Sequence, residues 1–295
     1  MMAGDAFAST ASMGGLPPAG QAVGIIAGQG MLPVAVADGL IARGHPVVCL
    51  GLHGQSQEAD LAARCRVFHR VGLLRINQWI RMFRRHGVSS AVMVGRVAKS
   101  NMYQKYHMFR YIPDWRTARV WLWRTGHDKR SARLLAAVAD EMAAGGITLL
   151  DARPYIPEQM AEPGILTRCR PSAAALADIE FGWPLLRDVN RLLIGQSIAC
   201  KDREVIAVEA MEGTDALIDR AAQLCRRGGW VLLKASNPNQ DIRFDLPTVG
   251  PQTIENLARG GGSALVLEAG RTIMLEKQRL IALAEKAGIA IVGRA

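Results

Sequence analysis

The second half of this chain contains no histidine, although six histidines stand in the first half. Any acid–base or metal chemistry within residues 151–295 must therefore use carboxylate, lysine, arginine, tyrosine or cysteine side chains. Cysteine is scarce too: the five cysteines are an odd number, and no Cys-x-x-Cys pair occurs. This set predicts neither a disulfide framework nor a zinc site, and it indicates buried thiols in a reducing compartment.

Long apolar runs are also missing, since no stretch approaches the ~20 residues that a membrane-spanning helix needs. Residues 1–20 are rich in Ala, Gly, Ser and Pro, and they lack the basic start and apolar run of a signal peptide. We therefore predict a disordered extension at 1–20 on a cytoplasmic protein. With 295 residues, 49% of them hydrophobic, the chain is long enough for two domains.

Acidic residues are few in the first half of the chain. Residues 1–150 hold 18 Lys and Arg against 8 Asp and Glu, whereas residues 151–295 hold 18 of each, so the net charge of +10 belongs to the first half. Within it, residues 101–124 alternate seven Tyr, Phe and Trp with Lys and Arg. This composition suits a membrane interface or anionic amphiphile, single-stranded nucleic acid, or a helix with a packed aromatic face and a solvated basic face.

Residues 21–153 predict a Rossmann-like domain with a parallel sheet, because short apolar runs alternate with amphipathic segments. The first run, 23–27, is followed by Gly28-Gln29-Gly30, at the turn where a doubly wound fold holds phosphate. Pro33 takes the place of the third glycine of the dinucleotide motif. Gly28 and Gly30 are therefore either phosphate contacts or residues that let strand and helix pack closely.

A proline-rich segment, residues 154–171, predicts a linker to a second α/β domain at residues 172–295. In this second domain we expect a hairpin about Lys201 and Asp202, followed by alternating helices and strands, within a mixed sheet.

The first of two polar segments in the second domain is Glu212-Gly213-Thr214-Asp215. Thr214 is a favourable N-cap, and Asp215 in the first turn suits the helix dipole, which could account for both residues completely. The same junction would also point backbone N–H groups at an anion. A phosphate held there would lie near Glu212 and Asp215, which are oxygen ligands of the kind that magnesium prefers.

The second polar segment, residues 240–250, is either a solvated connector or a binding loop. Asp245 is the third carboxylate that we assign to the magnesium ion, while Lys234 and Arg243 would balance phosphate charge. Gln196, after Gly195, is either a buried structural amide or a ligand contact.

These segments carry a resemblance to the UDP-2,3-diacylglucosamine pyrophosphatases of the LpxI type. The matching stretches are residues 24–33 (GIIAGQGMLP), 195–196 (GQ), 208–216 (VEAMEGTDA), Lys234, and 240–251 (QDIRFDLPTVGP). The resemblance implies magnesium-dependent hydrolysis of the pyrophosphate of UDP-2,3-diacylglucosamine, giving UMP and 2,3-diacylglucosamine 1-phosphate in lipid A biosynthesis. It also implies two domains with the substrate between them, and a cytoplasmic enzyme peripheral to the inner membrane, with no nucleic acid as a partner.

The resemblance places the key aspartate of the family at Asp245, as catalytic residue or metal ligand. The metal candidates are Asp245, Asp215 and Glu212, and the substrate-binding candidates are Gly28, Gly30, Gln196, Gly213, Thr214, Lys234, Gln240, Arg243 and Thr248.

Three positions depart from the family pattern. A Gly-x-Val-x-Arg-Pro motif ends here in Lys99-Ser100, an Asp-Asp pair is missing near residues 130–132, and an Asp before Gly-Gln is replaced by Leu193. The missing Asp-Asp pair motivates a second hypothesis, a relative that binds a nucleotide sugar or lipid without catalysis. The Gly-x-Gly turn motivates a third, an NAD(P)-dependent oxidoreductase, against which Pro33 speaks.

Overall fold

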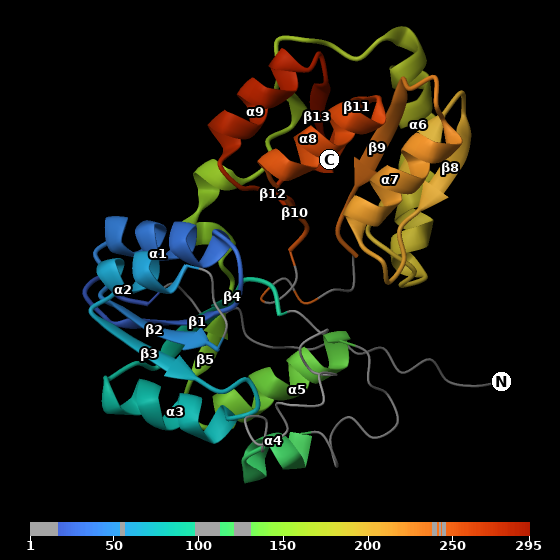
Figure 1. The fold of residues 1–295 in the computed structure, drawn as a ribbon. Helices are drawn as coiled ribbons and strands as arrows, with labels where there is room; N and C mark the ends of the chain where they lie inside the picture. The colour runs from blue at the N-terminus through green and yellow to red at the C-terminus, as the bar shows by residue number, and fades with distance from the viewer. Residues whose placement is uncertain are drawn as a thin grey trace, which may run out of the picture. The chain divides into compact units, whose positions relative to one another are not determined.

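The computed structural model describes residues 17–53, 57–97, 113–120, 131–237, 241, 243 and 246–295. The chain divides into two compact units, residues 1–152 and 153–295 (Figure 1). The extension expected at residues 1–20 lies outside the described residues except for its last four. In the described part of the chain, no helix combines the length and apolar character needed to cross a bilayer.

The first unit contains a five-stranded parallel sheet with the order β3-β2-β1-β4-β5. This is the order of the first five strands in doubly wound nucleotide-binding folds. Figure 1 shows α1 and α2 on one face of the sheet and α3 and α5 on the other. The elements are β1 (Val23–Ala27), α1 (Leu32–Ala42), β2 (Val47–Leu52), α2 (Glu58–Arg64), β3 (Val67–Val71), α3 (Ile76–Arg85), β4 (Ser90–Val94), α4 (Trp115–Arg119), α5 (Ser131–Ala144) and β5 (Thr148–Leu150).

The second unit contains a mixed six-stranded sheet with the order β6-β13-β11-β9-β7-β8. Strands β9, β11 and β13 are parallel, whereas β7 runs antiparallel to β9 and forms a hairpin with β8. The strands are β6 (Gly164–Ile165), β7 (Ser197–Lys201), β8 (Glu204–Val208), β9 (Trp230–Lys234), β11 (Gly262–Glu268) and β13 (Ala290–Arg294), with a separate pair, β10 (Thr248–Val249) and β12 (Ile273–Met274). The helices are α6 (Ala173–Arg191), α7 (Thr214–Leu224), α8 (Pro251–Gly260) and α9 (Lys277–Lys286).

The prediction of an α/β chain with a parallel sheet followed by a mixed sheet is confirmed. The expected hairpin is present as β7 and β8, but its turn is one residue further along: Lys201 ends β7 and pairs with Glu204, and the turn residues are Asp202 and Arg203, both with positive φ. Residues 154–171, expected as a linker, contain two short 3-10 helices, η4 (Arg153–Tyr155) and η5 (Pro157–Gln159), and the strand β6. Because β6 pairs with β13, this segment is part of the second sheet.

Alternation along β9 explains how the second sheet is covered on both faces. Val231 and Leu233 pack with the apolar side of α6, whereas Trp230 and Leu232 pack with residues of α7, α8 and α9. All four side chains are fully buried. A strand buried on both faces reads as a continuous apolar run, which is why the sequence WVLL predicts a strand without showing polar alternation.

The expectation of buried thiols is met in the strands. All five cysteines are free, and Cys49 in β2 and Cys200 in β7 are fully buried. Burial, together with the charge of Asp178, raises the pKa of the Cys200 thiol to about 12. These two side chains therefore act as small apolar core residues, in which the thiolate form is disfavoured.

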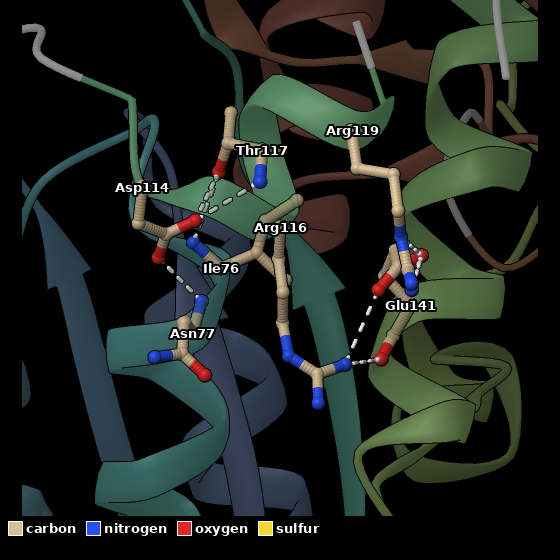
Figure 2. Close-up of polar contacts among 7 residues, drawn as sticks. All are labelled: Ile76, Asn77, Asp114, Arg116, Thr117, Arg119 and Glu141. Atoms are coloured by element: carbon tan, nitrogen blue, oxygen red, sulfur yellow. Dashed lines mark hydrogen bonds and ion pairs between the residues drawn. The ribbon is translucent and has the colours of Figure 1, made fainter. Parts of the chain in front are cut away.

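A short helix, α4, is fastened to the first unit by a buried carboxylate (Figure 2). Glu141 of α5 has no solvent exposure, and its two oxygens bind Arg116 at 3.2 Å and Arg119 at 2.5 Å. Asp114 caps α4 by accepting from the Thr117 N–H at 2.9 Å, and its other oxygen accepts from the Asn77 N–H in the first turn of α3 at 2.6 Å. Helix α4 is therefore held to both α3 and α5.

This arrangement bears on the aromatic and basic stretch at residues 101–124, of which only 113–120 are described. Trp115 is 56% exposed and its ring lies 5.0 Å from the Arg116 guanidinium, which itself faces the buried Glu141. For this part, the expected packed aromatic face is wrong, because the Trp115 ring is exposed; of the two basic side chains, Arg116 is largely buried and Arg119 stays 42% exposed. Trp121 and Trp123 lie outside the described residues.

We expect Glu141→Gln to destabilise the first unit by about 3 kcal/mol, because it leaves two arginines facing a neutral group in a buried site. Urea denaturation of the full chain, followed by circular dichroism, measures this change. The matched control is Glu58→Gln, which removes the more exposed ion pair with Arg70 and should cost at most about 1 kcal/mol. Equal effects of the two substitutions would contradict a structural role for Glu141.

Candidate active site

Most of the predicted site residues of the second unit that the structure describes are gathered at one edge of the mixed sheet. Ser197, the first residue of β7, pairs with Lys234, the last residue of β9. Ile198 pairs with Val208, the last residue of β8. The loop from β8 into α7, which carries Gly213 and leads to Thr214 at the start of the helix, therefore starts at the same edge as the loop that follows Lys234.

Lys234 is the centre of this edge and is only 5% exposed. Its Nζ lies 2.8 Å from Thr214 Oγ1, 3.4 Å from Ser197 Oγ and 3.9 Å from Glu209 Oε2. The Thr214 hydroxyl lies 3.2 Å from both oxygens of Glu209, which is itself 8% exposed. A buried ammonium is costly unless it is paired and hydrogen-bonded, and Glu209 supplies the compensating charge.

The capping role considered for Thr214 is wrong. The N-cap of α7 is Gly213, whose φ of +88° suits glycine, and no side chain caps this helix. Thr214 is the first residue of the helix, and its hydroxyl is engaged with Lys234 and Glu209. The N-terminus of α7 therefore lies beside a buried cation, and both features favour an anion.

Position 195 must be glycine for a steric reason that the sequence alone does not reveal. A Cβ at this position would lie 1.9 Å from the backbone oxygen of Glu209, so the two segments can pass only if residue 195 is glycine. The next residue, Gln196, accepts the N–H of Ala235 at 3.0 Å through its backbone oxygen. Gly195 and Gln196 thus bring the start of β7 against the segments that carry Glu209 and Lys234.

The carboxylates proposed for magnesium have other partners in the structure. Glu212 forms an ion pair with Arg220 at 3.1 Å, and Asp215 accepts from the side chain of Asn256 at 2.8 Å. Among the described residues, no three or more His, Cys, Asp or Glu are grouped so that they could hold a metal. Asp245 lies outside the described residues, and so does Gln240. The described side chains thus do not form a magnesium site by themselves.

The loop after β9 is partly described. Arg243 binds both carboxylate oxygens of Asp241, with its Nη2 at 2.5 Å from Oδ2. Thr248, in β10, donates its hydroxyl to the backbone oxygen of Leu246 at 3.1 Å. The predicted cation Arg243 is therefore already paired with a carboxylate of its own loop.

A polar network at the end of β9 and β11 was not predicted. Glu268, which is 5% exposed, accepts from the Ser236 N–H at 2.7 Å and hydroxyl at 2.5 Å, and from Arg187 at 2.6 Å. Arg271 lies 3.4 Å from the Ser236 hydroxyl. The network fixes the backbone directly after Lys234, at the start of the loop that leads to Asp245. Glu209 and Ser197 were missed as well: Glu209 lies within the matched stretch 208–216, but nothing in the local sequence marks it as the partner of Lys234.

Gly28 and Gly30, the two glycines expected near phosphate in the first unit, are explained by backbone packing and backbone conformation. A Cβ at Gly28 would lie 2.7 Å from the carbonyl carbon of Gly95, and the following residue, Gln29, bridges to Arg96. Gly30 has a φ of +101°, and its N–H donates to the side chain of Gln57 at 3.2 Å. These contacts account for both glycines by close packing and turn geometry.

The departures from the family pattern fall mostly outside the described residues. Lys99, Ser100 and Arg130 are not described, and residues 131–132 begin α5. Leu193 is described: it is 54% exposed and has a φ of +60°.

Comparison with known proteins agrees with this division of the chain. Residues 22–159 match the model of the LpxI N-terminal domain, and residues 162–292 match that of the LpxI C-terminal domain. The chain is also 31% identical, over 283 residues, to the UDP-2,3-diacylglucosamine pyrophosphatase LpxI of Caulobacter vibrioides, covering 92% of this chain and 96% of that protein. Because both domain models and a near full-length relative match, the chain belongs to the LpxI family, as its motifs predicted.

Proposed function

We propose that this chain is a pyrophosphatase that hydrolyses UDP-2,3-diacylglucosamine to UMP and 2,3-diacylglucosamine 1-phosphate, a step of lipid A biosynthesis. The support is its membership of the LpxI family and the activity named for the Caulobacter vibrioides relative, which it matches over nearly its whole length. The substrate is thus a nucleotide sugar with two acyl chains, and the bond cleaved is a phosphoric anhydride.

The observation that carries the proposal is the buried Lys234 beside the N-terminus of α7. A pyrophosphate carries two negative charges, and phosphate oxygens are bound well by backbone N–H groups at a helix N-terminus. The Lys234 ammonium adds a point charge, which strengthens hydrogen bonds to an anion in a water-poor site. Glu209 keeps this cation neutralised while the site is empty of substrate and holds Thr214, and through it Lys234, in position.

In the reaction, a water oxygen forms a bond to one phosphorus while the bridging P–O bond breaks on the opposite side. One water proton must leave, and the bridging oxygen departs with the other phosphate. We assign Asp245 to accepting that proton or to holding a metal ion, as the family motif implies. Gln196, Gln240, Arg243 and Thr248 are kept as proposed substrate contacts, whereas Gly28 and Gly30 would act through the shape of the turn.

We also keep magnesium as a proposed cofactor, on the resemblance alone. When bound, the ion would polarise phosphoryl oxygens. Purified protein is expected to release UMP from the substrate in magnesium, to stop when EDTA is added, and to recover with magnesium or manganese. Chromatography of UMP measures this.

The outcomes separate the hypotheses. Full activity in EDTA would exclude the metal while leaving the hydrolase intact. Substrate binding without UMP release in magnesium would favour the non-catalytic relative that the missing Asp-Asp pair suggests. The oxidoreductase hypothesis would need saturable NAD(P) binding, and the engaged N–H of Gly30 gives it no support.

Peripheral association with the inner membrane follows from the proposed substrate, because a diacylated lipid resides in a bilayer. The sequence suggested the stretch at residues 101–124 as the contact. In its described part, Arg116 and Arg119 are paired with Glu141, so these two cations are partly neutralised before any lipid is met. A surface other than residues 101–124 is therefore also a candidate for the contact with the bilayer.

A further inference from the structure

Three consecutive apolar side chains are exposed at the end of α6. Leu192 is 70% exposed, Leu193 54% and Ile194 48%, and Met211 in the loop before α7 is 100% exposed. We call these four residues the apolar tab. Single exposed apolar residues are common on protein surfaces, but a run of three with a fully exposed neighbour marks an interaction site.

The backbone of the tab is held firmly. The Leu193 N–H donates to the oxygen of Asn190 at 3.0 Å, and the Ile194 N–H donates to the oxygen of Val189 at 3.2 Å. These two bonds form a Schellman motif that ends α6, with Leu193 at the left-handed position. The side chains are therefore presented by a fixed frame.

Leucine is an unusual choice for this position. Leu193 has a φ of +60°, a conformation that glycine adopts without cost and that a side chain makes unfavourable. More than half of the side chain remains exposed, so burial within the chain offsets little of that cost. Leucine at this position is explained if its side chain is buried by a binding partner outside the chain.

The tab adjoins the candidate active site. Ile194 precedes Gly195, whose backbone lies against the Glu209 oxygen, and Met211 follows Glu209 by two residues. Glu209 in turn contacts Thr214 and Lys234. The tab thus forms an apolar rim beside the polar groups proposed to hold the pyrophosphate.

We propose that the apolar tab inserts into a lipid bilayer and so brings the site to its membrane substrate. This inference rests on the proposed function for the identity of the lipid. Four side chains are far fewer than the roughly 20–30 residues a side of a stable protein interface, but a few apolar side chains suffice for interfacial insertion. The nearby charges are paired, Arg191 with Asp188 and Arg220 with Glu212, so the contact is apolar and should resist salt.

Vesicle flotation of the full chain tests the proposal, with vesicles of phosphatidylethanolamine and phosphatidylglycerol at low and high salt. The parent should bind in high salt. The triple variant Leu192→Ser, Leu193→Gly, Met211→Ser should bind about tenfold or more weakly there. The single variant Leu193→Gly should bind more weakly and yet melt at the same or a higher temperature, because glycine relieves the left-handed strain.

The control is Leu224→Ser. Leu224 is 66% exposed at the far end of α7, about 15 Å from Thr214 along the helix axis, so this variant removes one exposed leucine side chain away from the site and is matched to Leu193→Gly. It should leave vesicle binding unchanged. Equal binding by the parent and the triple variant in high salt would overturn the proposal. A change of oligomeric state in Leu193→Gly, or a lower melting temperature of this variant, would overturn it as well.

Insertion of the apolar tab into a bilayer and hydrolysis of the substrate are tested by separate measurements. Vesicle binding is measured without substrate, so it can be present even if no UMP is ever released. If UMP is released, the triple variant should keep its kcat on detergent-dispersed substrate and show a raised KM for substrate in vesicles. An unchanged KM in vesicles would contradict membrane delivery through the tab while leaving the hydrolase proposal standing.

Discussion

Replacing Lys234 with methionine is expected to lower kcat about 100- to 1,000-fold, the range seen when one preorganised charge-stabilising group is removed from an active site. Methionine keeps much of the length of the side chain but removes the ammonium that lies 2.8 Å from Thr214 Oγ1. If the cation stabilises charge that develops as the anhydride breaks, kcat falls more than substrate affinity. Steady-state kinetics on UMP release measures both.

Loss of stability must be separated from loss of chemistry. In Lys234→Met, Glu209 stays buried without its cation, which should cost about 3–5 kcal/mol of folding free energy. Adding Glu209→Gln removes the unpaired charge, so the double variant should recover most of the stability and none of the turnover. Recovery of turnover together with stability would show that Lys234 serves the fold alone.

The second large effect is expected at Asp245. Asp245→Asn should lower turnover by several orders of magnitude while substrate still binds, if the carboxylate acts mainly in the transition state. Asp241→Asn in the same loop is the matched control, because Asp241 is engaged by Arg243. It should change activity far less. Near-normal turnover by Asp245→Asn would contradict the assignment of Asp245 as the catalytic residue or metal ligand.

The strands were predictable from sequence because burial on both faces leaves a continuous apolar signature. Val23–Ala27 and Trp230–Lys234 are each buried along their whole length, and both were visible as short apolar runs. The hairpin of β7 and β8 was marked by its polar turn, although the turn residues are Asp202 and Arg203, one position beyond the predicted pair. Local patterns of this kind need no knowledge of distant partners.

The chemistry of the site was only partly predictable, because it depends on contacts between distant segments. Thr214 looked like a helix cap, yet its hydroxyl meets Lys234 from a strand 20 residues away. Glu209 stands within the matched stretch 208–216, yet its role appears only when Gly195 brings the start of β7 against it. Similarly, the exposure of Leu193 and its left-handed backbone depend on how α6 ends, which the apolar sequence Leu-Leu-Ile does not reveal.

The most direct test of the account is to run the reaction in water enriched in oxygen-18 and to weigh both products by mass spectrometry. Hydrolysis of the anhydride predicts that one labelled oxygen enters either UMP or 2,3-diacylglucosamine 1-phosphate at each turnover, with the other product unlabelled. Intact substrate after prolonged incubation, or formation of both products without label, would contradict the claim that this chain cleaves the pyrophosphate with water.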